Sequence, residues 1–300
     1  MITTYQDLLA WGSGQLAGAG VPEADLDAWY LFSEAFGISR AVYFLDQVRP
    51  VDISQDNLRK KVEQFRQWID RRKERIPLQY ILGSQEFMGY VFQVNEHVLI
   101  PRQDTEILVE EILADCKRQK SKGLSALDMC TGSGCIAISL KLLGNDCFSK
   151  ILAVDLSEEA LRTAGDNAKR LGAEIIFLHS DLFFNVPRES VDILVSNPPY
   201  IPKETIDTLM PEVRDYEPRM ALEASDNGLY FYRRLAGEGF DYVKPGGWIY
   251  VEIGFDQAEA VSGIFRDNGF TQIQVKKDLA GLDRIVKACR PKSVSAARSS

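Results

Sequence analysis

The sequence predicts an α/β fold, a parallel β-sheet with helices on both faces, joined to a smaller helical domain. After Pro101, apolar segments of strand length alternate with segments of helical periodicity, which is the order of elements in βαβ units. Up to about Arg75, apolar residues recur at helical spacing, which is typical of a helical domain. The 300 residues, of which 45% are apolar, suffice for two hydrophobic cores.

The composition limits the classes of function. With 35 Lys and Arg against 43 Asp and Glu, the net charge of -8 gives the whole chain no electrostatic attraction to nucleic acid or to an anionic membrane. The five cysteines include no CxxC pair, which favours reduced thiols in a cytoplasmic protein, and we expect no metal site. The N-terminal residues lack the unbroken apolar run of a secretory signal, and no segment reaches transmembrane length.

The predicted elements divide the chain into four segments. Residues 1–80 form the helical domain, whose last helix is rich in Arg and Lys from Arg59 to Arg75, either as a solvated face or as a docking surface for a substrate. Residues 81–99 alternate apolar and polar residues with interspersed glycine, which predicts a β-hairpin linker. Residues 100–290 form the α/β domain, and the tail of residues 291–300 is expected to be disordered.

Within the α/β domain, short apolar runs predict strands, and helical patterns fill the intervals, for example over residues 158–171 and 256–268. This order is typical of a parallel sheet that is covered on both faces. The predicted strands are residues 125–129, 151–155, 175–179, 191–196 and 248–253, followed by a final β pair after Phe270.

The first of these strands runs into a loop with two glycines, DMCTGSGCIA, from Asp128 to Ala137. Gly132 and Gly134 allow the backbone to approach a ligand, and together with Ala137 they fit the G-x-G-x-x-A dinucleotide-binding pattern. The next strand ends at Asp155, whose carboxylate can accept hydrogen bonds from both hydroxyls of a ribose. The structural alternative at this point is a tight turn followed by an Asp that caps a helix.

The third strand is followed by HSDLFF, in which Asp181 can accept a hydrogen bond from an exocyclic amine and Leu182 can pack on a flat base. Asp181 taken alone fits a loop cap equally well. Because the carboxyl ends of parallel strands meet at one edge of a sheet, we expect the glycines, Asp155 and Asp181 to face one crevice. Together they predict a cofactor that contains adenosine.

The fourth strand ends in Asn197, Pro198, Pro199 and Tyr200. Proline has a fixed φ, and a residue that precedes proline is restricted to extended conformations, so this loop is rigid. It holds the Pro198 carbonyl beside the side-chain oxygen of Asn197, and two acceptors at a fixed separation match the two N–H groups of a planar amino group. Tyr200 would add an aromatic wall.

Three other functions share part of this pattern. An NAD-dependent dehydrogenase would use the glycines, Ala137 and Asp155, but it leaves the N-P-P-Y segment unexplained. An adenine methyltransferase acting on nucleic acid explains N-P-P-Y, but the acidic balance and the lack of an extended basic target-recognition region count against it. A non-catalytic cofactor-binding module would not need the paired acceptors.

From Gly132 through Asp155 and Asp181 to Tyr200, the chain resembles the class I S-adenosylmethionine-dependent methyltransferases that methylate amino groups. Three segments, IPRQDTE, EPRMALEASDNGL and DLAGLDRIV, together with the helical front end, resemble more specifically the HemK family of protein-(glutamine N5) methyltransferases, which act on peptide chain release factors. This resemblance covers nearly the whole chain.

The resemblance implies a Rossmann-like, seven-stranded class I methyltransferase sheet, S-adenosyl-L-methionine as cofactor and release factors as substrates. It implies a monomeric cytoplasmic enzyme that binds neither nucleic acid nor membrane directly. The residues implied in catalysis are Asn197, Pro198 and Tyr200, and the same three residues with Pro199 are implied in substrate binding. The residues implied in cofactor binding are Cys130, Thr131, Gly132, Ser133, Gly134, Asp155, Asp181, Leu182 and Asn197. Cys130 departs from the family, which most often has glycine at this position. We expect a small side chain to be tolerated, but the local backbone angle does not follow from the sequence.

Overall fold

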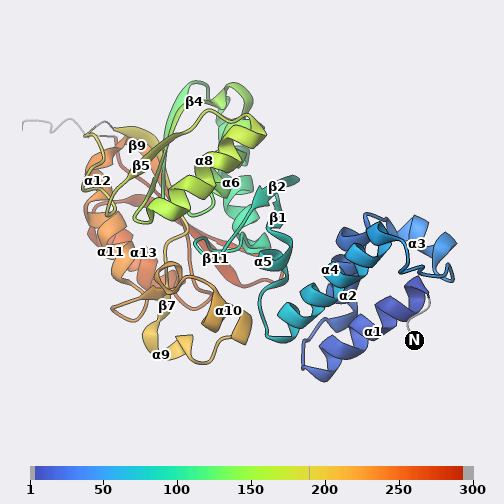
Figure 1. Ribbon diagram of the computed structural model, residues 1–300. Helices are drawn as coiled ribbons and strands as arrows, with labels where there is room; N and C mark the ends of the chain where they lie inside the picture. The colour runs from blue at the N-terminus through green and yellow to red at the C-terminus, as the bar shows by residue number, and fades with distance from the viewer. Residues whose placement is uncertain (1–3, 189, 293–300) are drawn as a thin grey trace, which may run out of the picture. The chain divides into compact units, whose positions relative to one another are not determined.

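The computed structural model describes residues 4–188 and 190–292, which form two compact units. Unit 1 consists of the chain up to Gly83 together with Met210–Tyr216, and unit 2 consists of Ser84–Leu209 and the chain from Glu217 onward (Figure 1). The tail for which disorder was expected lies outside the described residues, apart from residues 291 and 292.

Unit 1 is helical. Leu8, Phe32 and Phe65 are fully buried in its core, and the rings of Phe32 and Phe36 stack with their centroids 4.5 Å apart. Thr4 begins the first helix with a capping box, since its hydroxyl accepts a hydrogen bond from the backbone N–H of Asp7. The helices of unit 1 are α1 (Tyr5–Gly18), α2 (Ala24–Phe36), α3 (Arg40–Asp46), α4 (Asp56–Lys73), α5 (Leu78–Leu82) and α10 (Pro211–Tyr216).

Unit 2 begins with the expected hairpin, formed by β1 (Ser84–Phe87) and β2 (Tyr90–Gln93). Phe87 and Phe92 are buried in one of the hydrophobic cores of unit 2. The side chain of Asn167 accepts a hydrogen bond from the N–H of Gln93 and donates one to its carbonyl, so that the hairpin is fixed to helix α8 (Glu158–Leu171).

The central sheet of unit 2 has seven strands in the order β10-β11-β9-β6-β3-β4-β5, which confirms the predicted fold. Strands β9, β6, β3, β4 and β5 pair in parallel, whereas β11 is antiparallel to both of its neighbours. The strands are β3 (Leu124–Met129), β4 (Phe148–Asp155), β5 (Ile176–His179), β6 (Val191–Ser196), β9 (Val243–Glu252), β10 (Thr271–Lys277) and β11 (Asp283–Cys289).

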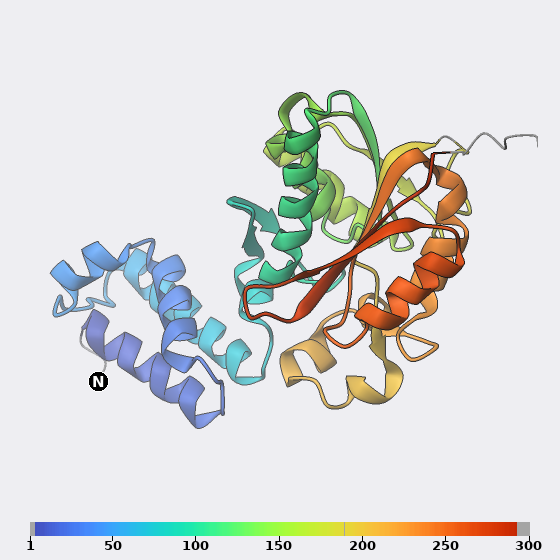
Figure 2. The same cartoon turned by 180° about the vertical axis from the view of Figure 1, so that it is seen from behind.

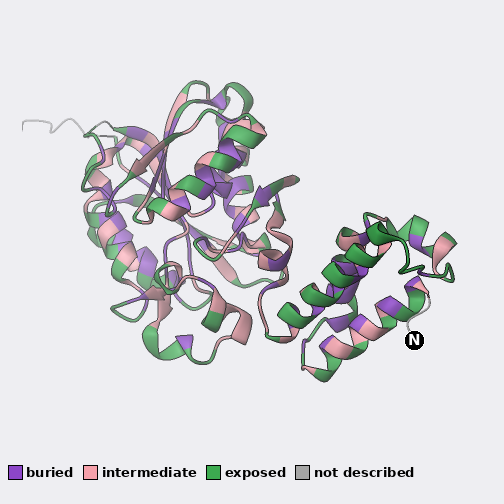
Figure 3. Cartoon of the chain, in the orientation of Figure 1, coloured by how far each residue is buried: buried purple, intermediate pink, exposed green. Residues whose placement is uncertain are grey.

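Helices cover both faces of this sheet (Figure 2). One face carries α6 (Gln103–Gln119), α7 (Cys135–Leu143) and α8, and the other carries α11 (Tyr230–Gly237), α12 (Gly239–Tyr242) and α13 (Ala258–Asp267). Figure 3 shows that the central strands are buried along most of their length and that the outer helix faces are exposed. Across residues 4–188 and 190–292, we find no helix with the length and apolar character of a membrane span.

Unit 2 also contains several short elements, one just before β4 and the others after β6. A 3-10 helix, η1 (Asn145–Cys147), leads into β4. Directly after the N-P-P-Y segment, β7 (Ile201–Pro202) and α9 (Lys203–Ile206) follow, and β7 pairs in parallel with β8 (Glu223–Ala224). A second 3-10 helix, η2 (Arg219–Ala221), precedes β8.

Candidate active site

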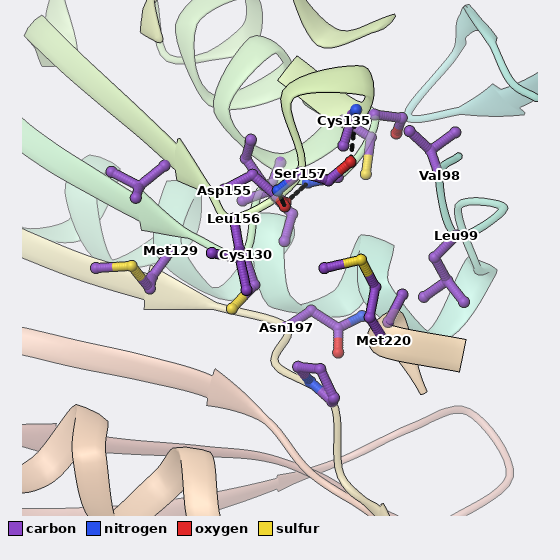
Figure 4. A pocket seen from close by; sticks show the side chains of 18 of the residues that line it. Val98, Leu99, Met129, Cys130, Cys135, Asp155, Leu156, Ser157, Asn197 and Met220 are labelled. Atoms are coloured by element: carbon purple, nitrogen blue, oxygen red, sulfur yellow. Dashed lines mark hydrogen bonds between the residues drawn. The ribbon is translucent and has the colours of Figure 1, made fainter. Parts of the chain in front are cut away.

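A cavity of about 300 Å³ lies at the carboxyl ends of β3, β4 and β6 in unit 2 (Figure 4). Its size is within the range of small-molecule sites. All residues implied in cofactor binding line it, with the exception of Gly134, and so does Pro199. The lining residues that the sequence had not indicated are His97, Val98, Leu99, Pro101, Arg102, Thr105, Met129, Cys135, Ile136, Val154, Leu156, Ser157, Ala160, Ser180, Met220, Ala221, Glu223 and Phe231.

The two glycines of the loop after β3 have different surroundings. Both have a positive φ, +55° at Gly132 and +80° at Gly134, which favours glycine. A Cβ at Gly132 would meet no protein atom within 4 Å, whereas a Cβ at Gly134 would lie 3.0 Å from the side chains of Ala164 and Ile138. Gly132 therefore leaves open space on the cavity side, while Gly134 allows close packing between α7 and α8.

Asp128 stabilises this loop by hydrogen bonds. Its carboxylate is fully buried and accepts hydrogen bonds from the hydroxyl of Thr131 at 2.6 Å and from the N–H of Ala137 at 3.2 Å. Burial raises the pKa of Asp128 to about 7. Through its two hydrogen bonds, the Asp128 side chain connects the loop at Thr131 with the first turn of α7 at Ala137.

Cys130 has φ +62°, the left-handed conformation that glycine adopts without strain. The backbone of the loop is thus the one that the family's usual glycine would adopt, and the Cys side chain is accommodated as part of the cavity lining. Burial raises the pKa of its thiol, so the group is a neutral, weakly nucleophilic part of the wall.

Asp155 lies at the end of β4 with both carboxylate oxygens oriented by the backbone. One oxygen accepts from the N–H of Gly132 at 2.8 Å and the other from the N–H of Ser157 at 2.9 Å. Ser157 itself caps α8 by accepting from the N–H of Ala160, so Asp155 is not the helix cap. Burial raises the pKa of Asp155, and these backbone hydrogen bonds oppose the effect.

Asp181 and Leu182, which follow β5, both line the cavity. Asp181 is exposed, whereas Leu182 is buried and has φ +45°. Asp181, which can accept hydrogen bonds, and the apolar Leu182 therefore line the same cavity as Asp155.

The side chain of Asn197 contacts helix α6. Its Nδ2 donates to the hydroxyl of Thr105 at 3.1 Å, and Thr105 donates in turn to the buried carboxylate of Glu252 at 2.6 Å. Pro198 and Pro199 are buried beside it. Asn197 and Pro199 line the cavity, but Pro198 is not among the lining residues.

Tyr200, for which the sequence suggested an aromatic wall, is not among the lining residues either. Its hydroxyl donates to Glu252 at 3.3 Å, and its carbonyl accepts from the side chain of Gln257 at 3.1 Å. These bonds connect Tyr200 with the end of β9 and with the segment that follows it.

Two of the segments that resemble the family, IPRQDTE and EPRMALEASDNGL, both contribute residues to the cavity lining. Glu217, from EPRMALEASDNGL, is buried and forms an ion pair with Arg102, from IPRQDTE. Glu217 also accepts a hydrogen bond from the N–H of Ile100 at 3.3 Å. Burial raises the pKa of Glu217, and Arg102 opposes the effect. The pairing of Arg102 with Glu217 could not be predicted from the sequence, because 115 residues separate them.

Comparison with known proteins supports the assignment of the fold. The chain shares the fold of a methyltransferase from Pyrococcus furiosus, with a TM-score of 0.51 and 17% identity over 68% of this chain and 91% of that one. It also shares the fold of a 16S rRNA N2 G1207 methyltransferase from T. Thermophilus, with a TM-score of 0.52 and 15% identity over 69% and 49%. Residues 103–212 match the family described as "Methyltransferase small domain". The sheet order and these likenesses show the fold of the class I methyltransferases.

Residues 7–83 match the family "PrmC N-terminal domain". Proteins named release factor glutamine methyltransferase are 40% identical in Geobacter sulfurreducens, over 95% of this chain and 96% of the relative, and 38% identical in Enterococcus faecalis, over 96% and 100%. The chain belongs to the release factor glutamine methyltransferase family, which confirms the resemblance seen in the sequence.

Proposed function

We propose that the protein transfers a methyl group from S-adenosylmethionine to the side-chain amide nitrogen, N5, of a glutamine in peptide chain release factors. The observation that carries this proposal is the side chain of Asn197, which lies at the edge of a cavity lined by Gly132 and Asp155. The names of the curated relatives support the choice of substrate.

The cavity residues fit the proposed cofactor. The oriented carboxylate of Asp155 retains lone pairs for the two ribose hydroxyls, and Asp181 with Leu182 can bind an adenine by a polar and an apolar contact. The open side of Gly132 leaves room for the rest of the molecule. When bound, the cofactor supplies a methyl group on a positively charged sulfur.

The N-P-P-Y segment would orient the substrate amide. An amide nitrogen is a poor nucleophile, because its lone pair is delocalised into the carbonyl. If the Oδ1 of Asn197 and the carbonyl of Pro198 each accept one N–H of the glutamine, they turn the lone pair toward the methyl group and stabilise the positive charge that develops on nitrogen. No other group has to remove a proton before the transfer.

The chemistry can be tested directly. The protein is incubated with S-adenosylmethionine and a purified release factor, and the digested product is analysed by mass spectrometry. We expect one added methyl group on a glutamine. Methylation of nucleic acid instead, in a parallel reaction with labelled cofactor, would refute the proposal.

We propose further that residues 1–80 dock the release factor, and that the enzyme acts as a cytoplasmic monomer without binding nucleic acid. Lys60 and Arg71 support docking, since both are exposed and lie three turns apart on one face of α4. Replacing both by Glu should raise the KM for intact release factor by about tenfold, whereas the rate on a short glutamine peptide should stay the same. Arg266→Glu, an exposed change on α13, is the control. Equal effects on both substrates would contradict docking.

A further inference from the structure

We infer that Thr105 and Glu252 are positioning residues that fix the amide of Asn197 with its Oδ1 directed at the substrate. This inference rests on the proposed function and adds two residues to it. Neither residue stands in the N-P-P-Y segment, and the three come from different parts of unit 2: α6, the end of β9 and the loop after β6.

The contacts form a chain of hydrogen bonds. The Nδ2 of Asn197 lies 3.1 Å from the Oγ1 of Thr105, which lies 2.6 Å from an oxygen of Glu252. The second oxygen of Glu252 accepts from the hydroxyl of Tyr200 at 3.3 Å. Thr105 and Glu252 are each 2% exposed, so water does not compete for the bond between them.

The direction of each bond follows from the donors available. An ionised carboxylate only accepts, and a hydroxyl has one proton to donate. Because Thr105 gives its proton to Glu252, its oxygen can only accept from Asn197. The group of Asn197 that faces Thr105 must therefore be the NH2, which leaves the Oδ1 on the other side.

This orientation matters because the two ends of an asparagine amide have the same shape but opposite polarity. If the amide of Asn197 turned over, its NH2 would face the NH2 of the substrate glutamine, and two donors would meet. The hydroxyl of Thr105 and the carboxylate of Glu252 together exclude that state. A residue without hydrogen-bonding groups at either place would leave both orientations accessible.

Two matched pairs of variants separate positioning from packing. Thr105→Val keeps the shape and removes the hydroxyl, whereas Thr105→Ser keeps the hydroxyl. Glu252→Leu removes the acceptor, whereas Glu252→Gln keeps one acceptor oxygen for Thr105. Methylation of release factor is measured at pH 8, because burial raises the pKa of Glu252 to about 7. Titration with S-adenosylmethionine and circular dichroism show whether each variant is folded.

We expect Thr105→Val and Glu252→Leu to lower kcat by about ten- to a hundredfold with little change in cofactor affinity, and the Ser and Gln variants to stay within about threefold of the parent. In an Asn197→Ala background, Thr105→Val should lower the rate by less than about twofold more, since residues that act as a unit are not additive. Equal losses for Val and Ser, or a full further loss in the Asn197→Ala background, would overturn the inference.

A second measurement does not depend on activity. The side-chain NH2 signals of Asn197 in a nitrogen-15 NMR spectrum are identified by their loss in Asn197→Ala. We expect the one proton that bonds to Thr105 to be protected from exchange with water in the parent and in Thr105→Ser, and unprotected in Thr105→Val. Absence of protection in the parent would overturn the inference, and this result stands whether or not the parent methylates a release factor.

Discussion

The ion pairs of Glu212 allow a quantitative test of how α10 is held in unit 1. The carboxylate of Glu212 accepts from Arg72 at 2.8 Å and from two nitrogens of Arg75 at 2.7 Å each. Arg72 also pairs with Asp27 at 2.7 Å. The side chains of Glu212 and Arg72 are 13% and 7% exposed, so solvent screens these pairs only weakly.

The substitution Glu212→Gln keeps the shape of the side chain and removes its charge. A hydrogen bond to a charged group contributes about 1.5 to 3 kcal/mol, and Gln can still accept at one oxygen. We therefore expect the free energy of unfolding of unit 1 to fall by about 2 to 3 kcal/mol at pH 7. Arg59→Gln on the same helix α4 is the control: its partner Asp56 is well exposed, and no measurable change is expected.

The pH dependence provides a second check. Burial alone would raise the pKa of Glu212, but hydrogen bonds from Arg75 and Arg72 lower it to about 2 from the usual 4.5. A carboxyl group with a lowered pKa in the folded state stabilises the fold above pH 4.5, and this contribution is lost as the pH falls toward 2. The difference between parent and Glu212→Gln should therefore be constant above about pH 5 and shrink below it.

Urea unfolding followed by tryptophan fluorescence measures unit 1 selectively, because Trp11, Trp29 and Trp68 lie in it and only Trp248 lies in unit 2. Midpoints are compared for the parent, Glu212→Gln and Arg59→Gln at several pH values. Unfolding of Glu212→Gln at the parental urea concentration at pH 7, or a stability deficit that persists unchanged at pH 3, would contradict the stabilising role of these ion pairs.

Three further predictions concern unit 2. Asp155→Ala should raise the dissociation constant of S-adenosylmethionine about tenfold or more, and an unchanged calorimetric titration would contradict the proposed ribose contact. Asn197→Ala should lower the methylation rate about 100- to 1,000-fold while circular dichroism stays parental; a parental rate would disprove the paired-acceptor mechanism. Lys287 is buried and lies 2.6 Å from both Glu111 and Asp115, so Lys287→Met should destabilise unit 2 by about 3 to 5 kcal/mol, visible as a lower Tm.

The sequence predicted the sheet and the strand-end loops because their signals are local. Periodicity decides between strand and helix within a few residues, and the loops after β3 and β6 carry their own glycines and prolines. Strand β9 shows the limit of such signals. It begins at Val243 rather than at residue 248, and it runs through Pro245 and Gly247, residues that usually interrupt a strand. Its register against β6 shifts there, and a Cβ at Gly247 would lie 2.8 Å from the carbonyl of Asp192.

The sequence left two interpretations of the basic helix α4 open, a solvated face or a docking surface, and one of its cations fits neither. Arg72 is buried and pairs with Asp27 and Glu212, which is neither a solvated face nor a docking surface. Lys60 and Arg71 remain exposed. The sequence could not distinguish these cations, because the partners of Arg72 lie 45 and 140 residues away.

The rigidity that two prolines give the N-P-P-Y backbone is not sufficient to place its polar groups. The side chain of Asn197 still rotates about its own bonds, and both orientations of its amide fit the same space. Contacts from two distant elements, Thr105 on α6 and Glu252 at the end of β9, determine which end of the amide faces the cavity, and Glu252 also holds the hydroxyl of Tyr200. Thr105 and Glu252 are 147 residues apart, so only the assembled sheet brings them together. In the proposed mechanism, a local motif therefore supplies the two acceptors, and the tertiary fold determines the direction of the Asn197 amide.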